Sequence, residues 1–213
     1  KRFLTEFRES SPSDQYLNAA GPPNVLLRNL GNGKFDVAPT SDQLALWVNS
    51  LQSTWSDFDM DGDFDVYISN DFAPDNLFRN DGEAGFVDIT SESGGEAMMG
   101  FGMGASWGDY NNDMRPDLYI SNMYSKAGVR ITGQIEGLDR RMGLSAEGNR
   151  LFQNATSGFK LMSALDGPLH VVAKADWSWS GQFVDVDNDG FLDIAVASGY
   201  YTAPKQIATG KDL

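Results

Sequence analysis

Three copies of one acidic nine-residue motif constrain this chain of 213 residues more than any other feature. The motif reads DFDMDGDFD at residues 57–65, DYNNDMRPD at 109–117 and DVDNDGFLD at 185–193. Each copy places an oxygen-bearing side chain at its positions 1, 3, 5 and 9. A motif that recurs with the same flanking pattern marks a structural repeat, so we expect a fold built from repeated units.

The spacing of these side chains matches the chemistry of calcium, which takes its oxygen ligands from carboxylates, amides, backbone carbonyls and water. A tight loop can direct positions 1, 3 and 5 at one centre, add the backbone carbonyl of position 7 and close with position 9. Calcium is therefore the predicted cofactor, with up to three ions. The predicted ligands are Asp57, Asp59, Asp61, Asp63 and Asp65 in the first loop, Asp109, Asn111, Asp113, Arg115 and Asp117 in the second, and Asp185, Asp187, Asp189, Phe191 and Asp193 in the third.

The motif is not an EF-hand, although the first six positions are alike. An EF-hand needs a bidentate glutamate at position 12 and a helix on each side. Position 12 is Ile68, Ile120 and Val196 in the three copies. The residues after each loop, FDVYISN, PDLYISN and LDIAVAS, are rich in β-branched and aromatic side chains. They predict a strand that begins at the last ligand of each loop.

The alternative is that Asp, Asn and Gly merely form turns. Three loops with the same ligand positions favour a metal instead, because clustered carboxylates repel one another without a cation. Gly62 and Gly190 stand at position 6, where a sharp turn favours a residue that tolerates positive φ. The second loop departs from the pattern at Asn111, Met114 and Arg115, and we expect it to bind calcium most weakly.

Composition narrows the possible roles. The net charge of −14 argues against binding nucleic acid or an anionic membrane surface. The chain has no cysteine, which excludes disulfides and thiolate chemistry. No apolar run is long enough to span a membrane. Millimolar-range calcium sites suit proteins outside the cytoplasm, so we expect a secreted, periplasmic or cell-surface location.

The repeat extends beyond the acidic loop. An aromatic residue, Trp55, Trp107 or Phe183, precedes each loop by two positions. A second signature reads NVLLRNLGNGKF from residue 24, DNLFRNDGEAGF from residue 75 and NRLFQNATSGF from residue 149. One unit is thus strand, calcium loop, strand, strand, turn, strand. A four-stranded unit with a period near 50 residues is the signature of a β-propeller blade.

The loop spacing also locates an insertion. The first two loops begin 52 residues apart, and the second and third begin 76 residues apart. We place the excess at about residues 124–148 and expect a short helix in it. Its basic residues are either solvated surface or a local patch for an anion or a partner.

The repeat, with its acidic loop, its flanking strands and its Asn/Gly turn, resembles the FG-GAP/VCBS-repeat propellers. These propellers include the calcium-binding blades of integrin α subunits. The phrases NxLFRNxGxGxF and WxDxDxDGxxDxYISN are most similar to the ASPIC/UnbV-associated branch. The resemblance implies an all-β fold of four-stranded antiparallel blades within a propeller of about seven blades. It also implies calcium loops between the first two strands of some blades, and roles in adhesion and in binding protein or carbohydrate.

We divide the chain into an N-terminal loop segment (1–23), propeller blades (24–200) and a C-terminal tail (201–213). The blade region holds the last two strands of one blade, two whole blades near 45–90 and 100–165, and the first two strands of another. Because the repeats are too few for a closed propeller, we expect further blades from the same or another chain.

The leading hypothesis is a non-enzymatic, extracellular calcium-binding scaffold whose partner is a protein or glycan. The alternatives are the accessory or catalytic propeller of a calcium-dependent polysaccharide-active enzyme, and a structural subunit of a surface assembly. No motif supplies a partner for His170, the single histidine, so we interpret it as structural. Trp177 and Trp179 alternate as in a strand and fit either packing between blades or a sugar-stacking platform.

Overall fold

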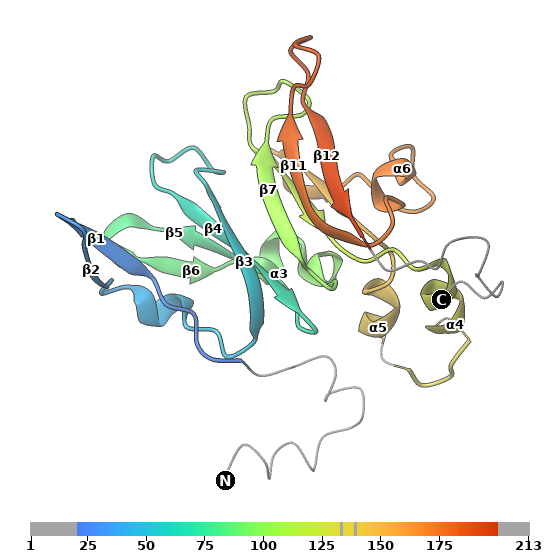
Figure 1. Cartoon of the computed structure of the whole chain (residues 1–213), viewed down its shortest axis with the longest axis horizontal. Helices are drawn as coiled ribbons and strands as arrows, with labels where there is room; N and C mark the ends of the chain where they lie inside the picture. Colours follow the sequence, from blue (N-terminus) through green and yellow to red (C-terminus); the bar gives the residue numbers. More distant parts are fainter. Residues whose placement is uncertain (1–20, 133, 139, 200–213) are drawn as a thin grey trace, which may run out of the picture.

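The computed structural model describes residues 21–132, 134–138 and 140–199. These residues form two four-stranded and two two-stranded antiparallel sheets, joined by loops and short helices (Figure 1). Most of the predicted segment 1–23 and all of the predicted tail 201–213 lie outside the described residues. None of the described helices is both long and apolar enough to cross a membrane.

The first four-stranded sheet has the order β3-β4-β5-β6. Its strands are β3 (Asn49–Ser56), β4 (Asp65–Asp71), β5 (Asn76–Asn80) and β6 (Phe86–Asp88). The first acidic loop joins β3 to β4, and Trp55 pairs with Val66 on either side of it. The sheet is the predicted whole blade near residues 45–90.

The second four-stranded sheet repeats this arrangement in the order β7-β8-β9-β10. Its strands are β7 (Gly104–Gly108), β8 (Asp117–Ser121), β9 (Arg150–Ala155) and β10 (Gly158–Leu161). The pair Trp107 and Leu118 takes the place of Trp55 and Val66. The second acidic loop therefore has the same position in its sheet as the first.

The two-stranded sheets correspond to halves of the same unit. β1 (Leu27–Gly31) and β2 (Lys34–Val37) carry the second signature, which forms β5–β6 and β9–β10 in the four-stranded sheets. β11 (Ser178–Val184) and β12 (Asp193–Ser198) flank the third acidic loop. The last predicted ligand, Asp65, Asp117 or Asp193, is the first residue of its strand in all three copies, which confirms the expected loop-to-strand order.

Short helices occupy the connections. They are η1 (Ser41–Leu44), η2 (Gly82–Ala84), α3 (Thr90–Ser93), η3 (Gly95–Met98), α4 (Lys126–Thr132), α5 (Arg140–Leu144) and α6 (His170–Ala173). The insertion contains two helices, α4 and α5, where we expected one. His170 begins α6 and is exposed. Its Nδ1 lies 3.0 Å from the Gly167 carbonyl oxygen.

The sheets stack through their first strands. β7 contacts both β3 and β11, so the first strands of three consecutive units lie side by side (Figure 1). Gly104, at the start of β7, lies close to both neighbours: a Cβ there would be 2.5 Å from Gln52 Oε1 and 3.5 Å from the Trp179 carbonyl oxygen. The arrangement is consistent with blades of an FG-GAP propeller. Closure of the blades into a ring stays a prediction.

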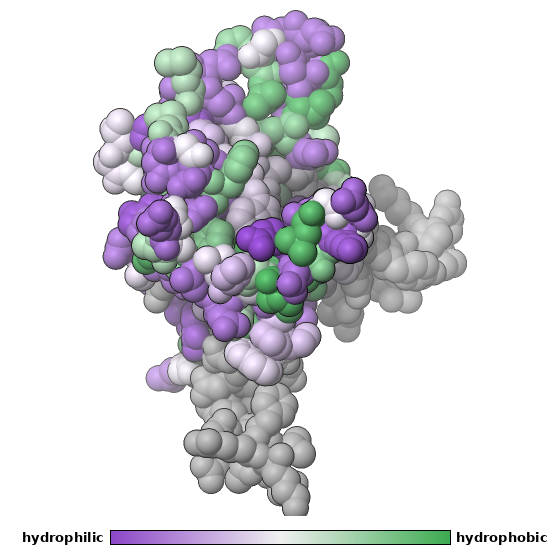
Figure 2. Space-filling view, turned by 90° about the vertical axis from the view of Figure 1, so that its left-hand side faces the viewer, coloured by the Kyte–Doolittle hydropathy of each residue, from purple (hydrophilic) through white to green (hydrophobic). Residues whose placement is uncertain are grey.

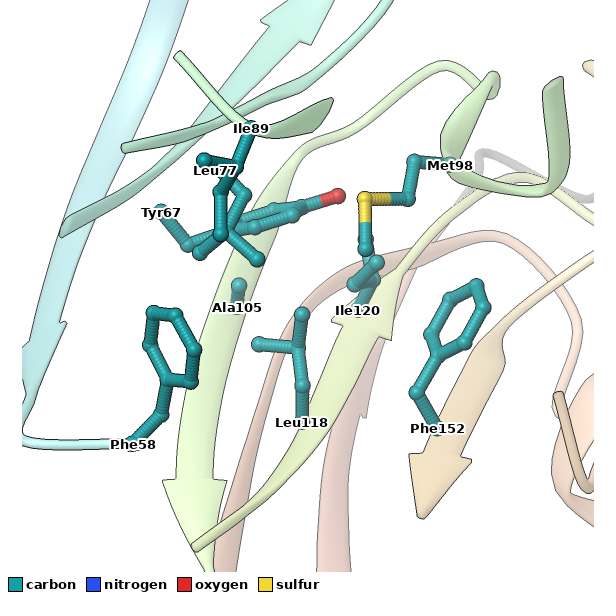
Figure 3. Close-up of a cluster of buried hydrophobic side chains, with 9 residues drawn as sticks. All are labelled: Phe58, Tyr67, Leu77, Ile89, Met98, Ala105, Leu118, Ile120 and Phe152. Carbon is teal, nitrogen blue, oxygen red and sulfur yellow. The ribbon is translucent and has the colours of Figure 1, made fainter. Parts of the chain in front are cut away.

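The main core lies between the two four-stranded sheets (Figure 3). Its members come from both sheets and their loops: Phe58, Tyr67, Leu77, Ile89, Met98, Ala105, Leu118, Ile120 and Phe152. A second cluster of buried side chains consists of Leu44, Val66, Ile68 and Phe78, and Leu26, Leu46 and Phe86 pack against it. Successive residues of β4 thus join different clusters. This two-sided burial explains why VYI shows no alternation of polar and apolar residues.

The side of the molecule with β1 and β2 mixes hydrophobic and hydrophilic side chains (Figure 2). Leu27, Leu30, Phe35 and Val37 of these strands are all more than half exposed. Trp179, expected to pack between blades or to stack on a sugar, is also 51% exposed. Its Nε1 donates a hydrogen bond to the Gly199 carbonyl oxygen.

Candidate metal-binding loops

In the first loop the structure brings three predicted ligands together. One carboxylate oxygen from each of Asp57, Asp59 and Asp61 lies within 4.8 Å of the others. The loop folds around its own first acid, because the backbone N–H groups of Asp61 and Gly62 both donate to the Asp57 carboxylate, each at 3.0 Å. The Asp63 N–H donates to Asp61 Oδ1 at 3.0 Å. These bonds hold the three acids on one side of the turn.

The third loop has the same geometry. Asp185, Asp187 and Asp189 form a second triad within 4.8 Å. Asp189 and Gly190 donate their backbone N–H groups to the Asp185 carboxylate, at 3.1 and 3.0 Å. Phe191 donates to Asp189 Oδ1 at 2.8 Å. Two loops more than a hundred residues apart in sequence therefore present the same acidic cluster.

The second loop keeps the turn but has one carboxylate fewer in the cluster. Asp113 and Met114 donate to the Asp109 carboxylate at 3.0 and 2.7 Å, and Arg115 donates to Asp113 Oδ1 at 3.0 Å. The Asn111 amide donates to Asp113 Oδ2 at 3.0 Å. The amide already occupies one oxygen of Asp113, and the cluster has two carboxylates where the other loops have three, so weaker metal binding here stays a prediction.

Left-handed backbone at two positions shapes all three turns. Position 6 has positive φ in each: 100° at Gly62, 68° at Met114 and 87° at Gly190. Glycine adopts this conformation without penalty, whereas the Met114 side chain opposes it. Position 4 is also left-handed, at Met60, Asn112 and Asn188. The sequence pattern predicted position 6, but position 4 shows no fixed residue type.

The acid at position 9 lies outside the triad and has hydrogen bonds of its own. Asp65 is fully buried, and its two oxygens accept the backbone N–H groups of Phe58 and Asn80 at 3.1 and 2.8 Å. Asp65 does not belong to the acidic triad. It ties the start of its loop to the third strand of its own sheet. The exposed Asp193 makes one such bond, from the Val186 N–H at 3.3 Å.

Asp117 repeats this arrangement in the second loop. It is fully buried, and its Oδ1 accepts the Asn154 backbone N–H at 2.8 Å. Its Oδ2 has no hydrogen bond of good geometry among the described residues. The Tyr110 N–H nevertheless lies near enough to lower the pKa somewhat. A buried, poorly partnered carboxylate oxygen beside two further acids is the kind of group that a cation would satisfy.

The electrostatics of the loops favour a bound cation. Burial raises the pKa of Asp65 and of Asp117 to about 6 in each case, and neighbouring loop acids add to the shift. The pKa of Asp59 is also raised, first by partial burial and then by Asp61. The donor set of the triads contains only oxygen, which suits a hard ion such as Ca²⁺. The residues present therefore fit calcium in the first and third loops.

Sequence reasoning missed the residues that attach the first loop to the next sheet. Phe58, at position 2, is 6% exposed and packs against Trp107 and Phe159 of the second sheet, with ring centroids 5.9 and 5.4 Å away. Its carbonyl oxygen accepts a 2.7 Å hydrogen bond from the Asn154 side chain. The aromatic at position 2 and the asparagine six places into the second signature are visible in the sequence. Their pairing across blades is not.

A second missed group is a buried ionisable cluster away from the loops, around Asp75. Asp75 accepts hydrogen bonds from the Tyr67 hydroxyl and from the Asn70 backbone N–H, both at 2.7 Å. Burial raises its pKa to about 7. Arg150 approaches from β9, and its guanidinium donates to the carbonyl oxygens of Ala97 and Leu144.

Comparison with known proteins agrees with the geometry. Residues 57–120 match the FG-GAP-like repeat family, and residues 177–211 match the FG-GAP repeat family. The first match begins at the first triad, and the second covers the third acidic loop.

Among curated proteins, cartilage acidic protein 1 of Xenopus tropicalis is 34% identical over 58 residues. The matched segment covers 27% of this chain and 9% of the relative. The acidic loops, the strands that follow them and both family matches lead to one conclusion: the chain contains FG-GAP and FG-GAP-like repeats and is distantly similar to cartilage acidic protein 1.

Proposed function

We propose that this chain is a non-enzymatic, calcium-stabilised part of an extracellular β-propeller, which serves as a scaffold for binding a protein or a carbohydrate. One observation carries the proposal: the acid triads at Asp57–Asp61 and Asp185–Asp189 have the same internal hydrogen bonds. Bound calcium would neutralise each triad and fix the turn between the first two strands of its blade. It would thereby link metal binding to folding.

The extracellular location rests on charge and on calcium supply. The net charge of −14 includes the acids of three loops, and clustered carboxylates need a steady supply of cation to stay paired. Extracellular modules commonly bind calcium in the millimolar range. The similarity to a protein named for cartilage and for its acidity points the same way.

The half-blades suggest where further blades dock. A groove of about 290 Å³ lies beside β3, lined by residues that include Asn24, Leu26, Ser50, Leu51 and Trp55. Leu51 is 48% exposed and Trp55 is 37% exposed. We propose that the first strands of another blade, from the same or another chain, occupy this groove.

Thermal unfolding with and without chelator tests the calcium proposal. At a hundredfold excess over Kd, one bound ion stabilises the folded state by about 2.7 kcal/mol. For a chain of this size, that corresponds to a rise of about 5–11 °C in Tm for each site. Asp61→Asn and Asp189→Asn should each remove about half of the calcium-dependent rise, and the double variant most of it. A Tm that does not respond to EDTA in the wild type would refute the proposal.

A further inference from the structure

The first acidic loop forms the whole β3–β4 connection of the first sheet, and its Phe58 side chain reaches into the second sheet. Phe58 stands between two triad members in sequence, yet its ring is buried in the core between the sheets (Figure 3). Trp107 lies nearly parallel to it, with 9° between the ring planes. The conformation that gathers Asp57 and Asp59 is therefore the one that inserts Phe58 into the neighbouring blade.

Asn154 connects this insertion to the second loop. Its side-chain amide donates to the Phe58 carbonyl oxygen at 2.7 Å, and its backbone N–H donates to Asp117 Oδ1 at 2.8 Å. Asn154 is 4% exposed, so both bonds are shielded from water. One residue of β9 thus touches the backbone of the first loop and the last acid of the second.

The equivalent residue in the first sheet provides a contrast. Asn80 donates its backbone N–H to Asp65 Oδ1 at 2.8 Å, as Asn154 does to Asp117. Its side chain, however, donates to the Phe64 carbonyl oxygen of its own sheet, at 3.3 Å and in an exposed position. Asn80 therefore shares the local role of Asn154 and lacks the connection between blades.

We propose that calcium binding at the first loop is coupled to the docking of the next blade through Phe58 and Asn154. The proposal rests on the calcium-binding function above. When Asn154 holds the Phe58 backbone, the triad is preorganised for the ion. Because coupling between two equilibria is reciprocal, calcium at the first loop should in turn tighten the contact with the second sheet.

The test isolates the first loop in the full chain. In a parent variant carrying Asp113→Asn and Asp189→Asn, calcium binding is followed by titration calorimetry. Adding Asn154→Ala should weaken calcium binding at the first loop about fivefold, the lower end of typical coupling between sites. Adding Asn80→Ala, the matched control, should change it less than twofold. Equal affinities with Asn154→Ala and Asn80→Ala would overturn the coupling.

Two further readouts keep the test decisive. Phe159→Leu removes part of the ring packing on Phe58 without touching a hydrogen bond. It should also weaken calcium binding at the first loop, so it replaces Asn154→Ala in the test if that variant does not fold. In the parent variant, calcium should slow hydrogen exchange of the amides in β9 as well as those of residues 56–66. Protection confined to residues 56–66 would count against the coupling. A parent variant that binds no calcium at all would instead refute the proposed calcium function.

Discussion

Replacing Asp75 by asparagine should remove a loss of stability that the wild type undergoes as pH rises above 5, so the variant gains stability relative to the wild type with increasing pH. Asp75 is fully buried, and its folded-state pKa is about 7, against 3.8 as the ordinary value. The folded chain therefore keeps a proton that the unfolded chain has already lost. Stability from this group is fully present below pH 4 and is lost as pH rises toward and through 7.

The size of the effect follows from these two pKa values. Linkage predicts that ionisation of Asp75 lowers the free energy of unfolding by about 3 kcal/mol between pH 5 and pH 8. The cost of the charge is limited by hydrogen bonds from the Tyr67 hydroxyl and the Asn70 N–H to the carboxylate, and by the nearby Arg150. The negative charge of Asp71 adds to the cost. The asparagine variant cannot ionise, so the difference between variant and wild type isolates this one group.

An amide should fit at this position, because the repeat already has one. Asn149 aligns with Asp75, and its Oδ1 accepts the Asn122 N–H at 2.7 Å, as Asp75 Oδ1 accepts the Asn70 N–H. Its amide also donates to the Ser178 hydroxyl of the next unit, at 2.8 Å.

The measurement is urea denaturation of wild type and Asp75→Asn at pH 5, 6, 7 and 8 with constant calcium. The reciprocal change, Asn149→Asp, should introduce a similar loss of stability with rising pH. A difference between wild type and Asp75→Asn that is constant across this range would refute the reasoning.

Three further changes test the packing and the turns by denaturant unfolding. Met114→Gly should raise the free energy of unfolding by about 1 kcal/mol, because φ is 68° there and the side chain is 84% exposed; a loss of stability would show that the methionine makes a favourable contact. Gly148→Ala should lower it by about 3 kcal/mol or more, since a Cβ would meet the Ala173 carbonyl oxygen and φ is 92°; an unchanged midpoint would contradict the close packing. Phe58→Ala should lower it by about 3–5 kcal/mol, and a loss below about 1 kcal/mol would mean that the ring is not a core residue.

The acidic motif predicted much of the fold because each of its positions has a definite chemical role. The loop is specified locally by the alternate acids on a tight turn and by the glycine at position 6. The strand is specified by the β-branched run that follows. Strand starts at Asp65, Asp117 and Asp193 followed directly. The helix at His170 was missed because a single short turn has no periodic signal.

Contacts between repeats could not be predicted in the same way. The pairing of Phe58 with Asn154 joins residues 96 positions apart, and nothing in either local sequence specifies the other. The hydrogen bonds of position 9 were not predicted either: the buried Asp65 carboxylate accepts two backbone N–H groups, and its role as a ligand stays a prediction. Asp75 was overlooked because one acid in a turn sequence is ordinary, and only its burial makes it unusual.

Calcium titration of the chelator-treated protein tests the central claim most directly. Isothermal calorimetry should detect binding at the first and third loops, with any binding at the second loop weaker than both, because Asn111 replaces a carboxylate there. Asp61→Asn and Asp189→Asn should each abolish one of the two stronger sites and leave the other. Absence of calcium binding in the wild type, or two strong sites that survive both substitutions, would contradict the account.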